Sequence, residues 1–124
     1  MKTNQHPKYL LLDTITGSPL TRLVAVDAAG KSVSEARSKG RSLFLILKKF
    51  FGTKAVAQIK GIAVLNGPGE FSTVRQGVVM ANSLSWATGL PIAPIQAGDR
   101  VNDRSKWSHD FVAAIYSRPP NITR

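Results

Sequence analysis

The first residue that could carry chemistry is Asp13, which ends the apolar run Tyr9–Leu12. A carboxylate at the end of a strand can hold a divalent cation beside a phosphate, or it can cap the turn that follows. Cleavage of nucleic acid with two metal ions needs three or four converging carboxylates. The other acidic candidates for such a nuclease site are Glu70, Asp99, Asp103 and Asp110. A capping role for Asp13 is the favoured interpretation, and a metal-dependent nuclease is the alternative.

The second feature is the turn Gly67-Pro68-Gly69, which follows the apolar run Ile62–Leu65 and precedes a helical stretch. The N–H groups where a helix begins attract anions, so this turn could hold a phosphate. It is not a Walker loop, because no Gly-Lys-Ser/Thr follows. Pro68 has no N–H to donate, and Glu70 would repel a phosphate. We therefore expect a sharp strand-to-helix turn, with Phe71 plugging the end of the sheet.

Histidines and cysteines indicate no further site. The chain has no cysteine, and its two histidines, His6 and His109, have no metal-ligand spacing such as HxxxH. No Ser-His-Asp arrangement can be assigned. We expect no bound metal, no cofactor and no catalytic residue in this chain.

The chain is strongly basic, with a net charge of +10. Such a charge favours acidic partners, including nucleic acid. A run without any acidic residue extends from Arg37 to Lys60, and the candidate nucleic-acid contacts within it are Arg37, Lys39, Arg41, Lys48 and Lys49. A solvated basic surface explains the same residues. No aromatic side chains are spaced along a basic strand as a base-stacking platform requires.

Hydropathy and turn residues predict one α/β domain in residues 1–124. Its core is expected within residues 8–96, followed by a polar loop and an extra strand, Phe111–Tyr116, in residues 97–124. The predicted elements are strands Lys8–Asp13, Thr21–Val26 and Lys31–Val33, helix Ser34–Phe51, strand Ile62–Leu65, helix Thr73–Thr88 and strand Leu90–Ile95. This order, β-β-β-α-β-α-β, is typical of a ribonuclease H-like (actin-type) half-domain.

The two predicted helices have more apolar faces than one sheet can cover. In the second helix, Val74, Val78 and Ala81 share one face, whereas Val79 and Trp86 lie on another. Small residues, Gly77 and Ala81 among them, would let another helix approach closely. Aromatic side chains are favoured at interfaces, so we expect a partner surface at Phe44, Leu47, Phe51, Val79, Asn82 and Trp86. The alternative is that the spare faces of the second helix pack on Leu43–Phe51 within the same chain.

The glycine-rich turn resembles a motif of the bacterial TsaB (YeaZ) family, GPGSFTGLR followed by IG. The residues that match it are Gly67, Pro68, Gly69, Phe71, Arg75 and Gly77. Ser72 and Val74 stand for the family's Thr and Leu, whereas Glu70 and Thr73 depart from its Ser and Gly. A weaker match is Asp13-Thr14, which resembles the family's Asp-Thr-Ser. The resemblance covers roughly residues 8 to 96 and lacks most of the family's second half.

This resemblance implies a function in tRNA modification. TsaB-like proteins help to make N6-threonylcarbamoyladenosine (t6A), but the catalyst is the paralogue TsaD, which TsaB binds through a helix pair. TsaE, an ATPase, joins them, and TsaB also forms homodimers through the same surface. The resemblance thus implies a non-catalytic scaffold in the cytoplasm that meets tRNA through the complex. No apolar stretch is long enough to span a membrane, and the first residues resemble no signal peptide.

Overall fold

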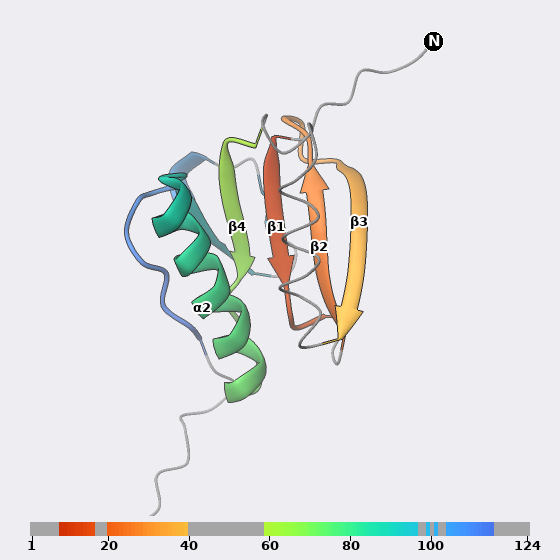
Figure 1. Ribbon diagram of the computed structural model, residues 1–124, viewed down its shortest axis with the longest axis vertical. Helices are drawn as coiled ribbons and strands as arrows, with labels where there is room; N and C mark the ends of the chain where they lie inside the picture. Colours follow the sequence, from red (N-terminus) through yellow and green to blue (C-terminus); the bar gives the residue numbers. More distant parts are fainter. Residues whose placement is uncertain are drawn as a thin grey trace, which may run out of the picture.

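The computed structural model describes residues 8–16, 20–39, 59–96, 99, 101 and 104–115 of the chain. Its strands form a five-stranded sheet in the order β3-β2-β1-β4-β5 (Figure 1). The elements are β1 (Tyr9–Asp13), β2 (Leu20–Val26), β3 (Ser32–Lys39), β4 (Gly61–Leu65), helix α2 (Phe71–Thr88), β5 (Ile92–Ile95) and a short 3-10 helix, η2 (Arg104–Lys106).

The sheet combines an antiparallel half with a parallel half. β1 pairs with β2, and β2 with β3, in antiparallel register. β4 lies parallel to β1 on its other side, and β5 lies parallel to β4. A three-stranded meander therefore leads into parallel strands joined by a helical crossover, which confirms the predicted ribonuclease H-like arrangement.

The turn between β2 and β3 follows its sequence signature. The carboxylate of Asp27 accepts hydrogen bonds from the backbone N–H groups of Ala29 and Lys31, both at 2.9 Å. Gly30 has a φ of 91°, a conformation that only glycine adopts at low cost. Residues 27–30 therefore form a tight hairpin turn between β2 and β3.

The third strand is longer than the sequence predicts. β3 includes Ser34–Lys39, so a helix that begins at Ser34 is wrong for these residues. They pair with β2 instead, with Arg37 opposite Arg22 and Glu35 opposite Val24. The remaining part of the predicted helix lies outside the described residues.

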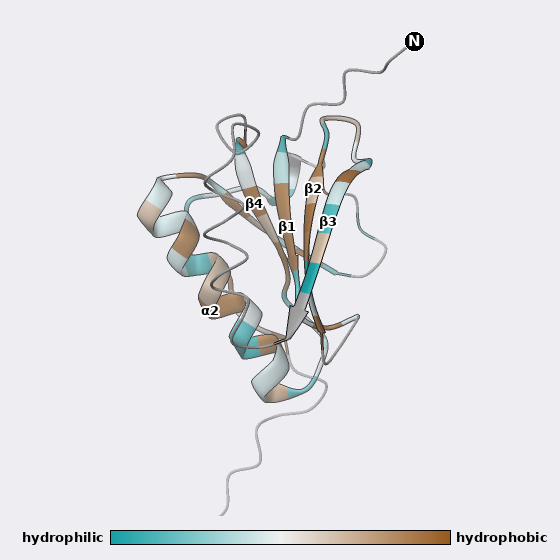
Figure 2. Ribbon diagram, turned by 45° about the vertical axis from the view of Figure 1, so that its right-hand side comes forward, coloured by the Kyte–Doolittle hydropathy of each residue, from teal (hydrophilic) through white to brown (hydrophobic). Residues whose placement is uncertain are grey.

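Two apolar layers enclose the sheet. On one face, α2 packs Val74, Val78 and Ala81 against a cluster that includes Leu12 and Ile62. Figure 2 shows apolar residues along β1, β2 and β4, whereas α2 alternates between apolar and polar residues. On the other face, Trp107 stacks on the ring of Tyr9 with centroids 5.0 Å apart. A second cluster surrounds this pair and contains Val24, Val26, Ala63, Ala93, Ile95 and Val101.

Helix α2 begins at Phe71, two residues before the predicted start, and ends at Gly89 as expected. The φ of Gly89 is 75°, and its N–H donates to the carbonyl of Ser85 at 2.9 Å. This left-handed residue ends the helix in the way that glycine commonly does. Within the described part of the chain, no helix is long and apolar enough to cross a membrane.

The described end of the chain, residues 104–115, passes beside α2 and the parallel strands (Figure 1). Ser108 exchanges backbone hydrogen bonds with Ile92 at 2.7 and 3.0 Å. The strand predicted at Phe111–Tyr116 is not formed over residues 111–115, which lie in an extended coil. Side chains of Asn66 and Asn82, rather than a neighbouring strand, satisfy part of its backbone.

Candidate partner-binding face

Asp13 occupies the buried end of β1 and serves the turn that follows it. Its side chain is 1% exposed, and one carboxylate oxygen accepts hydrogen bonds from the backbone N–H groups of Ile15 (2.8 Å) and Thr16 (2.9 Å). The other oxygen accepts from the Thr16 hydroxyl and from Arg22 Nη1, the latter at 2.8 Å. Both oxygens and the turn amides are therefore used within the protein, which fits the favoured capping interpretation.

Arg22 extends this network across the antiparallel strands. Its guanidinium also contacts the Glu35 carboxylate, with Nε 3.2 Å from Oε2, and Arg37 contacts the same carboxylate. The hydrogen bonds with Arg22 and Arg37 lower the pKa of Glu35 to about 2. The bond to Glu35 is the main reason that the pKa of Arg22 is raised. Arg37, a predicted nucleic-acid contact, is thus engaged in an ion pair on β3.

Within the described part of the chain, the acidic side chains of the nuclease alternative do not come together. Among the described residues, no three His, Asp or Glu side chains lie close enough together to hold a metal ion. Glu70 is exposed before α2, and Asp99 pairs with Lys106 at 2.6 Å. That hydrogen bond, together with one from the Gln96 N–H, lowers the pKa of Asp99. Asp103 lies outside the described residues, so this alternative gains no support.

The Gly67–Glu70 turn needs its glycines for close packing. Gly67 has a φ of 123°, and a Cβ atom there would lie 1.8 Å from the carbonyl oxygen of Ile115. A Cβ on Gly69 would lie 2.8 Å from Val74 Cγ2. The peptide bond between Gly67 and Pro68 is cis. These contacts confirm the sharp strand-to-helix turn.

Gly77 allows α2 to pack closely against the turn that follows β1. A Cβ on Gly77 would lie 2.7 Å from the Thr14 hydroxyl oxygen, which itself donates to the carbonyl of Thr73 at 2.8 Å. Ala81 is buried against the sheet. Small residues at these two positions therefore bring α2 close to its own sheet, so the expectation that they admit a second helix is wrong for Gly77 and Ala81.

The opposite side of α2 exposes large apolar side chains. Phe71 is 42% exposed, Val79 53% and Trp86 79%. The expectation that Phe71 fills the end of the sheet is therefore wrong. Its ring instead lies beside the Arg75 guanidinium, whose Cζ is 6.0 Å from the ring centroid. Val79 and Trp86 are seven residues apart, or about two helical turns, so they lie along one stripe.

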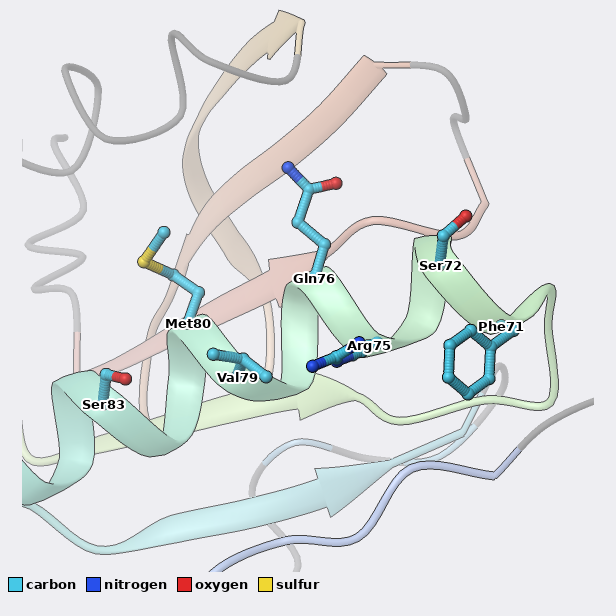
Figure 3. A pocket seen from close by; sticks show the side chains of 7 residues that line it. All are labelled: Phe71, Ser72, Arg75, Gln76, Val79, Met80 and Ser83. Carbon is cyan, nitrogen blue, oxygen red and sulfur yellow. The ribbon is translucent and has the colours of Figure 1, made fainter. Parts of the chain in front are cut away.

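Two shallow hollows follow this stripe. The first has a volume of about 500 Å³, and its described lining comes from α2. Figure 3 shows these side chains projecting from one side of the helix: Phe71, Ser72, Arg75, Gln76, Val79, Met80 and Ser83. The second, of about 420 Å³, shares Val79 and Ser83 and continues to Asn82, Trp86 and Phe111. We call the described side chains around both hollows the α2 outer face.

Phe111 is a member of this face from outside α2, and sequence reasoning missed it. It is 72% exposed, whereas its neighbour Val112 is 8% exposed and packs in the core. The Asn82 amide holds this segment through two hydrogen bonds to the backbone of Val112. The available sequence signal is an aromatic residue next to an aliphatic one, a pattern that also predicts a strand.

The structure thus brings Val79, Asn82 and Trp86 of the predicted partner surface onto one face of α2. The remaining predicted interface residues, Phe44, Leu47 and Phe51, lie outside the described residues. So do Arg41, Lys48 and Lys49 of the basic set, while Lys39 is described only as the last residue of β3.

Comparisons with known proteins give one partial match to a family model and matches to solved structures of the same fold. A model of the TsaD family, tRNA N6-adenosine threonylcarbamoyltransferase, matches residues 46–102. YeaZ from Pseudomonas aeruginosa superposes with a TM-score of 0.56 at 20% identity, over 71% of this chain and 44% of that one. The chain has a YeaZ-like fold.

A second solved structure gives the same result. It is described as an uncharacterized protein with similarity to peptidase YEAZ from Pseudomonas aeruginosa, and it matches with a TM-score of 0.58 at 19% identity. That match covers 73% of this chain and 43% of the other. The chain therefore spans less than half the length of these YeaZ-like structures. A search of curated protein sequences found no match.

Proposed function

We propose that this chain is a non-catalytic scaffold subunit of the t6A tRNA modification machinery, acting in the cytoplasm. In this proposal it corresponds to the first half of a TsaB-like protein and binds a TsaD-like catalytic paralogue, with a TsaE-like ATPase joining the complex. The proposal rests on the YeaZ-like fold and on the TsaD-family match to residues 46–102.

The single observation that carries the binding role is the exposure of the α2 outer face. Trp86 and Val79 are mostly exposed on a helix whose other side is fully packed against the sheet. Exposing contiguous apolar side chains to water is unfavourable, and such patches commonly mark interaction sites. Tryptophan is also enriched among the residues that contribute most to binding at interfaces.

The buried charges support a scaffold rather than a metal-dependent enzyme. The Asp13 carboxylate, the residue best placed for catalysis by sequence, is held by Arg22 and by the turn amides. A carboxylate held in this way caps a turn, which needs no substrate. The basic residues from Arg37 to Lys49 would add general attraction to tRNA within the complex.

The test is the molar mass of the purified protein in solution, alone and mixed with the TsaD-like protein of the same source. We expect a 1:1 heterocomplex that is lost in Trp86→Glu, because a carboxylate would be desolvated at the interface. A protein that ignores the TsaD-like protein would refute the proposal. A self-associated dimer that excludes it would place the α2 outer face in a contact between copies.

A further inference from the structure

We infer that Asn82 is a positioning residue that holds Phe111 beside Trp86, and that the resulting aromatic hollow receives an apolar side chain from a helix of the TsaD-like partner. This inference rests on the proposed function and adds to it a second segment of chain, residues 108–115. The hollow is lined by Val79, Asn82, Ser83, Trp86 and Phe111.

The geometry of Asn82 is specific to a side-chain amide. Its Nδ2 donates to the carbonyl oxygen of Val112 at 3.0 Å, and its Oδ1 accepts from the N–H of the same residue at 2.8 Å. The two bonds reproduce the pattern with which a neighbouring strand would pair. An aspartate could not donate to the carbonyl, and an alanine could make neither bond. A part-buried backbone segment without such partners would be destabilised.

The two hydrogen bonds between Asn82 and Val112, which we call the Asn82 clamp, fix the orientation of the neighbouring residues. Val112 is buried in the cluster beneath α2, so the preceding side chain, Phe111, points outward next to the helix. Asn66 secures the other side of the segment. Its side-chain Nδ2 donates to the Ala113 carbonyl at 2.9 Å, and its backbone carbonyl accepts from the Ile115 N–H at 2.6 Å. Figure 1 shows this segment running beside α2.

The shape of the face indicates a helix as its occupant. The positions Phe71, Arg75, Val79, Asn82 and Trp86 recur every three or four residues, which forms a ridge along the helix axis. All of them are exposed except Asn82, which is half-buried. Such ridges pack into the grooves of another helix. The hollow between Trp86 and Phe111 is mainly apolar, so an aliphatic or aromatic side chain fits it better than a polar ligand does.

Charge favours a different protein over a second copy of this chain. Each copy carries a net charge of +10, and like charges oppose their association at low ionic strength. Near the face the charges are mixed, because Arg75 lies on α2 while Glu70 and Asp110 lie at its margins. A partner helix that is apolar along one stripe is therefore the occupant to which we commit.

The experiment measures affinity for the TsaD-like protein in a double-mutant cycle. Phe111→Ala should weaken binding by about 30-fold, as expected for a central aromatic residue. Asn82→Ala should weaken it by about tenfold and speed amide hydrogen exchange at Val112. If Asn82 acts through Phe111, the double variant should bind no more weakly than Phe111→Ala alone. Ile115→Ala, an exposed apolar change on the same segment but outside the hollow, is the matched control.

The outcomes separate this inference from the proposed function. If the unmodified chain binds the TsaD-like protein and both variants bind equally well, the inference is overturned while the proposed function stands. Additive losses in the double variant would also overturn it, because Asn82 would then act independently of Phe111. If the unmodified chain shows no binding, the proposed function fails first. A dimer of this chain, broken by Phe111→Ala, would overturn the choice of occupant.

Discussion

The turn after β1 and the α2 outer face differ in how their side chains are satisfied. At the turn, the Asp13 carboxylate contacts Arg22, the Thr16 hydroxyl and two backbone N–H groups, all no more than 9 residues away in sequence. On the α2 outer face, Val79, Trp86 and Phe111 are exposed by half or more. The first region has the residue types of an active site but is used for folding. The second has few reactive groups, and its exposed area makes it the better candidate for function.

The largest effect on stability should come from removing the carboxylate at the turn. Asp13→Ala leaves two turn amides without their partner, and Arg22 Nη1 keeps the Thr16 hydroxyl, 3.1 Å away, as its acceptor. We therefore expect the free energy of unfolding to fall by roughly 2–4 kcal/mol. Chemical denaturation measures this directly. A loss below about 0.5 kcal/mol would show that the turn does not depend on Asp13.

A neighbouring pair on α2 sharpens the contrast between its two sides. Val78 is 6% exposed and Val79 is 53% exposed. Val78→Ala should cost about 2 kcal/mol through a cavity under the helix. Val79→Ala should change stability by no more than about 0.5 kcal/mol. Equal costs for the two substitutions would mean that the outer side of α2 is covered within the folded chain.

Gly77 joins the two regions, because it is where α2 meets Thr14. Alanine is the better helix former by about 1 kcal/mol, but its Cβ would lie 2.7 Å from the Thr14 hydroxyl oxygen. We expect the clash to prevail, with Gly77→Ala lowering stability by about 1 kcal/mol. Thr14→Ala removes the hydroxyl, so Gly77→Ala should cost less stability in the Thr14→Ala background than in the unmodified chain. A stabilised Gly77→Ala variant would contradict this close approach.

The smallest expected effect is the loss of stability at low pH when Glu35 becomes protonated. The pKa of Glu35 is about 2 in the folded protein, below its ordinary value of 4.5. A depressed pKa means that Glu35 contributes stability above pH 4.5 and loses that contribution as the pH falls toward 2. This contribution should be small and weakened by salt, because the pair is exposed. A titration of the Glu35 carboxyl by NMR checks it, with Glu35→Gln as the reference. A midpoint near 4.5 would contradict the ion pairs.

The sequence predicted the elements whose signals are local. The apolar runs of β1, β2 and β4, the glycine that ends α2 and the sheet-facing side at Val74, Val78 and Ala81 all follow from residue order. The assignment failed at Ser34–Lys39, where good helix formers such as Glu35, Ala36 and Arg37 pair with β2 as an edge strand. Glu35 and Arg37 carry opposite charges two residues apart, and they form an ion pair on one face of β3. This spacing of two residues was the signal that could have indicated a strand.

The candidate site was predictable only in part. Val79 and Trp86 follow from helical periodicity, because they lie off the buried stripe. The pairing of Asp13 with Arg22 depends on the register of β1 and β2, which sets the two residues opposite each other. The clamp by Asn82 depends on a contact across 30 residues of sequence. Spacing along one element gives no information about contacts of that kind.

The most direct test of the account is the affinity of this chain for the TsaD-like protein, measured by calorimetry for two single charge insertions. Val79→Glu places a carboxylate on the α2 outer face, and Ser34→Glu places the same charge at an exposed position of β3. We predict that Val79→Glu weakens binding by about 100-fold while Ser34→Glu leaves it unchanged. Equal affinities for the two variants would contradict the assignment of α2 as the binding face.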